Sequence, residues 1–134
     1  MKHPEYHLQK QICQWLSLQH PDVLFMSDTV ASVRLTMPQA TRNKAIQKEG
    51  FKCPDLLIFE PAGIHRGLFI ELKVDSPFKK NGELYAGEHL RGQQATIDAL
   101  NERGYCAMFS WGFDRTKALI EDYLSKRDMT EWFG

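Results

Sequence analysis

Hydrophobic residues near the start of the chain recur with the spacing of one helix face. The residues at positions i, i+4, i+7 and i+8 of this pattern are Leu8, Ile12, Trp15 and Leu16. The spacing predicts a helix over residues 4–19 that packs one side on a core. Pro4 suits the first helical position, because a missing N–H there costs no hydrogen bond. A short strand is expected to follow at 23–26.

The middle of the chain predicts one helix and two strands. Thr36 can cap a basic helix that runs to about Glu49 and stops at Gly50. Apolar runs at 55–59 and 67–74 predict two strands. The connection between them is short, which favours antiparallel pairing.

The last third of the chain begins with a long polar loop at 75–87. The elements expected after it are a helix over 89–103 closed by Gly104, a strand over 105–110, and a helix over 114–125 capped by Asp114. This order of helices and strands predicts an α/β fold, in which helices flank a mixed β-sheet. One domain over residues 1–134 is expected from the length.

The charge balance limits how the chain can bind a polyanion. Its 134 residues include 17 basic and 17 acidic side chains, which give a formal net charge of zero. Proteins that bind nucleic acid through bulk charge alone are usually strongly basic. DNA binding therefore requires a local basic patch, or metal ions that offset a group of acids.

The composition also bears on location. The chain has no apolar run near the ~18–20 residues of a membrane span, and its first residues are polar where a signal peptide needs an apolar stretch. The three cysteines are far apart in the sequence and suggest neither a zinc site nor a disulfide framework. We expect a cytoplasmic protein that does not bind membranes.

The strongest chemical signal is a carboxylate at the start of one expected strand and a Glu-x-Lys triplet inside the next. Asp55 follows Pro54, while Glu71 and Lys73 point to the same face of their strand because side chains alternate. Asp55 and Glu71 can supply hard oxygen ligands to a divalent cation, and the backbone carbonyl of Leu72 can supply a third. Lys73 can orient water or stabilise the transition state of phosphodiester hydrolysis.

A simpler interpretation of these charges stays open. Glu71 and Lys73 can form a surface ion pair on an edge strand, with Asp55 in a nearby turn, and such pairs contribute little. The order and spacing of the two motifs, with a hairpin between them, favour the catalytic interpretation.

These motifs resemble a known nuclease family. The residues that carry the resemblance are Pro54-Asp55-Leu56, Phe69-Ile70-Glu71-Leu72-Lys73-Val74, Gln93, Leu100 and Gly104-Tyr105. They are similar to the VRR-NUC family (virus-type replication-repair nucleases) of the PD-(D/E)XK superfamily, over a stretch from Gly50 to Leu124. The N-terminal helix also resembles the family.

The resemblance implies a restriction-endonuclease-like fold and a DNA endonuclease that depends on Mg²⁺, with Mn²⁺ as a substitute. It also implies a homodimer that acts on branched DNA, such as Holliday junctions, in the cytoplasm of a bacterial or virus-infected cell. A further implication is a metal-binding glutamate on the first helix and a supporting glutamine after Glu-x-Lys. Glu5 and Gln93 occupy the matching positions.

Helical geometry places both residues toward the core. At about 100° per residue, Gln93 lies roughly 30° from the mean direction of Leu90, Ile97 and Leu100, whereas Gln94 lies roughly 75° away. Glu5 lies roughly 35° from the centre of the apolar stripe of its helix. Two alternatives remain: the helix dipole favours an acid in the first turn without any function, and Gln93 can be a boundary residue bonded to a loop.

The sequence departs from the family pattern at two positions. Lys52 stands where the resemblance leads us to expect a glycine, three residues before the aspartate, and Thr96 stands where an aromatic residue often follows the glutamine. Neither position belongs to the Asp55, Glu71 and Lys73 set. Lys52 can either alter the approach to the site or place a cation near DNA.

Basic residues precede and follow the two strands in sequence. The candidates for contact with DNA phosphates are Lys44, Lys48, Lys52, Lys79, Lys80 and Arg91. Solvated surface charges are an equally good interpretation of any one of them. The favoured function is a metal-dependent deoxyribonuclease, and its rivals are a catalytically silent DNA-binding or assembly module and a structural subunit whose charges merely pair.

Overall fold

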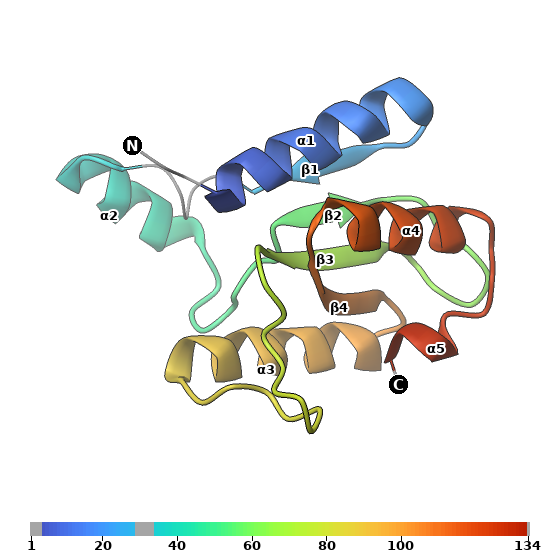
Figure 1. The fold of residues 1–134 in the computed structure, drawn as a ribbon. Helices are drawn as coiled ribbons and strands as arrows, with labels where there is room; N and C mark the ends of the chain where they lie inside the picture. The colour runs from blue at the N-terminus through green and yellow to red at the C-terminus, as the bar shows by residue number, and fades with distance from the viewer. Residues whose placement is uncertain (1–3, 29–33, 134) are drawn as a thin grey trace.

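A computed structural model describes residues 4–28 and 34–133 (Figure 1). The helices are α1 (Pro4–Gln19), α2 (Met37–Ile46), α3 (Glu88–Glu102), α4 (Phe113–Leu124) and α5 (Thr130–Phe133). The strands are β1 (Phe25–Ser27), β2 (Leu56–Ile58), β3 (Leu68–Lys73) and β4 (Cys106–Trp111). In the described part of the chain, none of the helices combines the length and the apolar content that a membrane crossing requires.

The strands form one mixed sheet in the order β1-β2-β3-β4. β1 pairs with β2 and β2 with β3 in antiparallel orientation, as the short connection between β2 and β3 predicts. β3 and β4 are parallel, and α3 is the crossover that a parallel pair requires. The predicted mixed sheet with flanking helices is confirmed.

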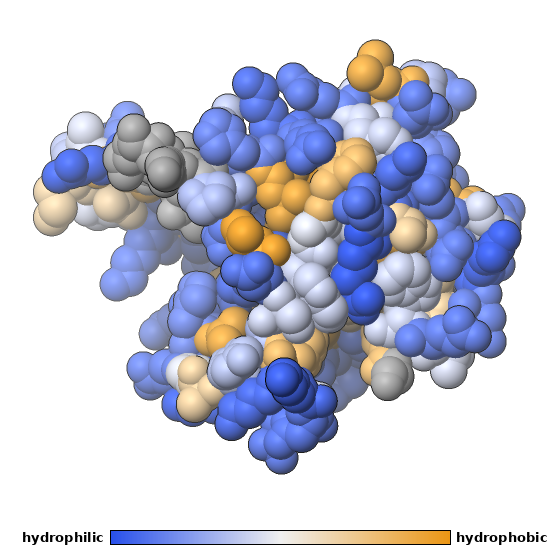
Figure 2. Space-filling view, in the orientation of Figure 1, coloured by the Kyte–Doolittle hydropathy of each residue, from blue (hydrophilic) through white to orange (hydrophobic). Residues whose placement is uncertain are grey.

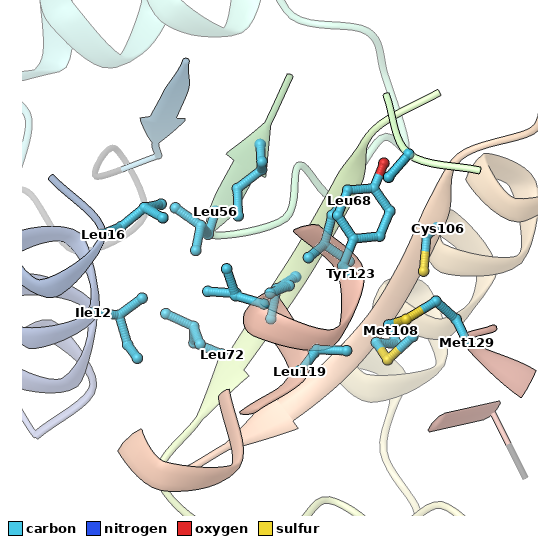
Figure 3. Close-up of a cluster of buried hydrophobic side chains, with 14 of the residues drawn as sticks. Ile12, Leu16, Leu56, Leu68, Leu72, Cys106, Met108, Leu119, Tyr123 and Met129 are labelled. Atoms are coloured by element: carbon cyan, nitrogen blue, oxygen red, sulfur yellow. The ribbon is translucent and has the colours of Figure 1, made fainter. Parts of the chain in front are cut away.

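Helices cover both faces of this sheet (Figure 1). α1 and α4 lie on one face, where Ile12 and Leu16 of α1 meet the inward side chains of the sheet, among them Leu56 and Leu72 (Figure 3). α3 covers the other face, where Ile97 packs with Phe69 and Phe109. Because both faces are covered, residues 68–72 are all buried whichever way they point.

Several element boundaries differ from those expected. The strand expected at 23–26 lies at Phe25–Ser27, and the helix expected to reach Glu49 ends at Ile46 with Gln47 as C-cap. α4 follows Gly112, so Asp114 lies inside its first turn and is not the cap. α5 was not expected at all.

Two predicted helix signals are present. Thr36 caps α2 in a capping box, in which its hydroxyl accepts from the Gln39 N–H and the Gln39 side chain accepts from the Thr36 N–H. Gly104 follows α3 with φ of 91°, a left-handed conformation that glycine adopts without strain.

α2 differs from the other long helices because none of its residues is buried. It projects from the side of the molecule that carries the start of α1 (Figures 1 and 2). Lys44 on this helix is therefore presented to solvent.

Candidate active site

The antiparallel register of β2 and β3 brings two acids together. Leu56 pairs with Ile70, so Asp55, just before β2, lies opposite Glu71. The Leu72 N–H donates to Asp55 Oδ2 at 2.8 Å, which continues the hydrogen bonding between the two strands past the first residue of β2. The Asp55 and Glu71 carboxyl groups lie within hydrogen-bonding reach of one another.

The surroundings of this pair disfavour two negative charges. Burial, followed by the charge of Asp55, raises the pKa of Glu71 to about 9. Burial also raises the pKa of Asp55, although the Leu72 N–H opposes that shift. The metal-free pair therefore holds one proton at neutral pH, because burial and the neighbouring charge of Asp55 keep the pKa of Glu71 near 9. A cation bound to both would take the place of that proton.

Glu5 and Lys73 act on the pair through their charges. The charge of Glu5 raises the pKa of both carboxyl groups and that of Lys73 lowers it. Glu5 is therefore near the pair, at the exposed start of α1. Lys73 is half-buried at the end of β3, and its Nζ lies 6.0 Å from the centroid of the Phe109 ring.

Gln93 faces the sheet, as its helical position predicts. Its side chain is only 6% exposed, and its Nε2 donates to Glu71 Oε1 at 2.7 Å. Its own Oε1 is buried without a hydrogen-bond partner among residues 4–28 and 34–133. Gln94 instead points along the partly exposed side of α3, where its Nε2 donates to Asp98 at 2.8 Å.

A hydrogen-bond network that the sequence did not reveal fixes the backbone of Asp55. The backbone oxygen of Asp55 accepts from Gln9 Nε2 at 3.1 Å, from Ser27 Oγ at 3.1 Å and from the Asp28 N–H at 2.9 Å. Gln9 is buried, and its amide also bonds to Ser27 Oγ and to the Asp28 carbonyl. The signal in the sequence is that Gln9 lies one helical turn after Glu5, so the two residues share a side of α1.

Cys53 lies beside the same acids without offering a nucleophile. Burial, then the charges of Asp28, Glu71 and Asp55, raises the pKa of its thiol to about 11. The thiol therefore stays protonated at neutral pH, and the thiolate is the reactive form of cysteine.

The two departures from the family pattern lie against one another. The Lys52 N–H donates to the buried Thr96 Oγ1 at 3.1 Å. The Lys52 side chain runs across Gly92, where an added Cβ would stand 3.3 Å from Lys52 Cε. The Lys52 backbone is thus anchored to α3, and its side chain lies over Gly92.

The other candidate DNA-binding residues lie in separate parts of the surface. Lys44 is on α2, Lys48 follows that helix in a turn, and Arg91 is on α3. Lys79 and Lys80 lie in the loop between β3 and α3, where an isolated bridge pairs Phe78 with Leu84. All five side chains are exposed, and none forms an ion pair within the described ranges.

The acids form a pair and not a larger pre-formed cluster. Across the described residues, no group of three or more His, Cys, Asp and Glu side chains is arranged to hold a metal ion. Asp55 and Glu71 are the two carboxyl groups in contact, and Glu5 influences their pKa values through its charge.

A mixed sheet covered on both faces, with the acids on adjacent strands and a lysine two residues further along, defines an α/β protein of the restriction-endonuclease-like class. A solved structure described as a VRR_NUC domain protein is similar to 96% of this chain and to 93% of its own, with a TM-score of 0.62 and 26% sequence identity. This likeness confirms the resemblance to the VRR-NUC family at the level of the fold. Comparisons with protein-family models and with curated proteins give no match.

Proposed function

We propose that this chain is a divalent-metal-dependent DNA endonuclease that hydrolyses phosphodiester bonds. The observation that carries the proposal is the contact between the Asp55 and Glu71 carboxyl groups, with Lys73 beside them and Gln93 bonded to Glu71. This arrangement occurs in a chain with the fold of a VRR_NUC domain protein.

The residues present fit a hard divalent cation. Two carboxyl groups in contact, one with its pKa raised to about 9, are an unfavourable arrangement that a cation relieves. The Leu72 N–H points toward Asp55, and in a strand the carbonyl of the same residue points the same way. Asp55, Glu71 and the Leu72 carbonyl would hold Mg²⁺ or Mn²⁺, and Glu5 would be an auxiliary ligand. When bound, the ion supplies Lewis-acid stabilisation of the scissile phosphate and lowers the pKa of water.

The chain's own residues then have distinct roles. Lys73 places a positive charge on the same face as Glu71, where it stabilises the charge that develops on the phosphate. Gln93 fixes the orientation of Glu71, and its unpaired Oε1 can accept from water or from Lys73. The Leu72 N–H and the network behind Asp55 hold the second carboxylate in place.

DNA would reach this centre through the exposed cations around it. Lys52 lies over Gly92 of α3 and would be one phosphate contact. The others would be Lys44, Lys48, Lys79, Lys80 and Arg91. Because each domain has one centre and little surface, we further propose a homodimer that presents two centres to branched DNA. Sedimentation at micromolar concentration tests this directly, and a species that stays monomeric and cleaves linear and four-way DNA equally contradicts it.

A cleavage assay tests the proposed activity. Linear, flapped and four-way DNA are incubated with Mg²⁺, with Mn²⁺ and without metal, and Asp55→Ala serves as the matched control. We expect metal-dependent cleavage by the natural chain and none by the variant. DNA binding without cleavage in either metal would favour the alternative, a catalytically silent DNA-binding or assembly module. Metal titration separates the two, because the nuclease requires binding of Mg²⁺ or Mn²⁺ that depends on Asp55 and Glu71.

A further inference from the structure

A cavity lies along the outer edge of β4, apart from the paired carboxyl groups. Its volume is about 510 Å³, within the roughly 300–1,000 Å³ typical of small-molecule sites. The loop after β3, α3, β4 and α5 contribute to its walls, and α5 lies beside the end of α3 in Figure 1. The aromatic residues in these walls are Phe78, Phe109, Trp111, Trp132 and Phe133.

The aromatic rings and the Arg115 guanidinium provide flat surfaces on which a planar ligand can stack. Phe78 meets Phe109 and Trp111 edge to face, with centroids 5.8 and 6.0 Å away. The Arg115 guanidinium lies 4.0 Å from the centroid of the Trp111 ring and 5.1 Å from that of Trp132. Aromatic rings and arginine planes are the groups on which proteins stack unpaired nucleobases.

The free edge of β4 adds hydrogen-bonding groups to this environment. The Cys106 N–H bonds inward to Gly67 of the chain leading into β3, so the next residue, Ala107, directs its backbone groups outward. The Asn101 side chain pairs with both of them, at 2.8 and 2.9 Å. By the same alternation, the N–H and C=O of Phe109 face outward along the cavity wall. A nucleobase edge presents the complementary donors and acceptors.

The cavity adjoins the candidate active centre through shared residues. Phe109 is the partner of Glu71 in the pairing of β3 and β4, and Trp111 is the partner of Lys73. Phe109 is part of the cavity wall, and the centroid of its ring lies 6.0 Å from Lys73 Nζ. A nucleotide next to a phosphate held at Lys73 can place its base in this cavity.

We infer that the cavity along β4 binds one unpaired nucleobase of the DNA substrate, stacked between the rings of Phe78 and Trp132 and against the Arg115 guanidinium, which lies over the Trp111 ring. The inference rests on the proposed nuclease function and deepens it. Such a site would make the chain selective for DNA in which a base next to the cleaved bond is free to leave the helix, as at flaps, bulges and branch points.

The test compares two DNA duplexes that differ only in the base. One carries a single unpaired deoxyadenosine, and the other carries an abasic residue at the same position. Binding is measured by fluorescence anisotropy in Ca²⁺, which replaces Mg²⁺ so that cleavage does not interfere. The natural chain should bind the duplex with the base at least about fivefold more tightly, the low end of what stacking of one base contributes.

Variants of the lining residues test whether this difference in affinity between the two duplexes arises in the cavity. Phe78→Ala and Trp132→Ala should each reduce it to less than about twofold, and Trp132→Phe should restore most of it, because a smaller ring still stacks. Phe59→Ala is the matched control, since this aromatic side chain is 48% exposed and does not line the cavity. Thermal melts check that each variant is folded.

The outcomes separate this inference from the proposed function. Equal binding of the two duplexes by the natural chain overturns the nucleobase site, even if the chain cleaves DNA. A base-dependent difference that persists in both Phe78→Ala and Trp132→Ala also overturns it. A difference that these variants abolish, in a chain that cleaves no DNA with any metal, supports the base site and removes the nuclease proposal.

Discussion

Gln93 and Glu71 are joined by a hydrogen bond of 2.7 Å between two side chains that are each 6% exposed. A buried carboxyl group beside another acid is costly unless donors or a cation compensate it. Gln93 supplies one donor from α3, on the face of the sheet that carries both Glu71 and Lys73. Its bond fixes the orientation in which Glu71 would meet a metal ion.

Removal of this bond should affect turnover. We expect Gln93→Ala to lower kcat at least roughly tenfold, the scale of a lost contact to a metal ligand. KM should change far less, because Gln93 is buried and does not reach the DNA surface. Steady-state cleavage kinetics in Mg²⁺ measure both constants. Activity within about twofold of the natural chain would show that Glu71 is held without Gln93.

The paired carboxyl groups should be indispensable for cleavage. Asp55→Ala or Glu71→Gln should abolish it, since each removes one of the two carboxylates that are in contact. Circular dichroism melts run beside the nuclease assay establish that the variants are folded. Near-normal cleavage by either variant would exclude that residue from the reaction.

Lys73 should act on the rate more than on affinity. One lost phosphate contact weakens binding modestly, whereas a charge aimed at the transition state contributes on the order of a hundredfold or greater. We therefore expect Lys73→Ala to reduce the single-turnover rate by that amount, with little change in DNA binding in Ca²⁺. A large loss of affinity with unchanged turnover would identify Lys73 as a phosphate anchor.

Much of the fold could be predicted from the sequence, because hydrophobic periodicity and turn residues act locally. The short connection between β2 and β3 correctly predicts their antiparallel pairing. Alternation along β3 places Glu71 and Lys73 on one face, and helical geometry places Gln93 toward that face. These predictions needed only the spacing of residues within single elements and the length of one connection.

The rest depends on contacts between distant segments. Gln9, Ser27 and Asp55 come from three separate segments, and no local pattern reveals that Gln9 and Ser27 both donate to the Asp55 carbonyl oxygen. The contact between Lys52 and Thr96 spans a similar gap in sequence, although both positions stand out as departures from the family pattern. The cavity along β4 was also missed, because its aromatic residues come from three separate segments, the loop after β3, β4 and α5.

Gln9 offers a test of the network behind Asp55. Gln9→Ala leaves part-buried hydrogen-bonding groups of Ser27 and Asp28 with fewer partners, so it should lower the unfolding free energy by about 1 kcal/mol. Because Gln9 attaches the helix that carries Glu5 to the strand end that carries Asp55, metal affinity should fall as well. The control is Gln11→Ala, an exposed glutamine on the same helix.

Urea unfolding and calorimetric titration with Mn²⁺ measure the two effects of Gln9→Ala. A variant that is less stable but binds Mn²⁺ as tightly as the natural chain would limit Gln9 to a structural role. Equal stability of Gln9→Ala and Gln11→Ala would contradict the network itself.

The raised pKa of Glu71 predicts how the stability of the metal-free protein depends on pH. The pKa is about 9 in the folded chain, against 4.5 for the ordinary group. Between these values the folded state holds a proton that the unfolded state has released. The stabilisation from that proton is complete below the ordinary pKa and is lost as the pH rises through the folded value.

The Glu71→Gln variant cannot undergo this titration, so its stability relative to the natural chain should increase with pH. We expect the difference in Tm between the variant and the natural chain to increase in the variant's favour from about pH 5 to about pH 8.5 in the presence of a chelator. Saturating Mn²⁺ should reverse the order at the higher pH, because a cation stabilises the ionised carboxylates that only the natural chain presents as a pair. If the two chains keep the same difference in Tm across this range, Glu71 is ionised in the metal-free protein, and the shared proton between Asp55 and Glu71 does not exist.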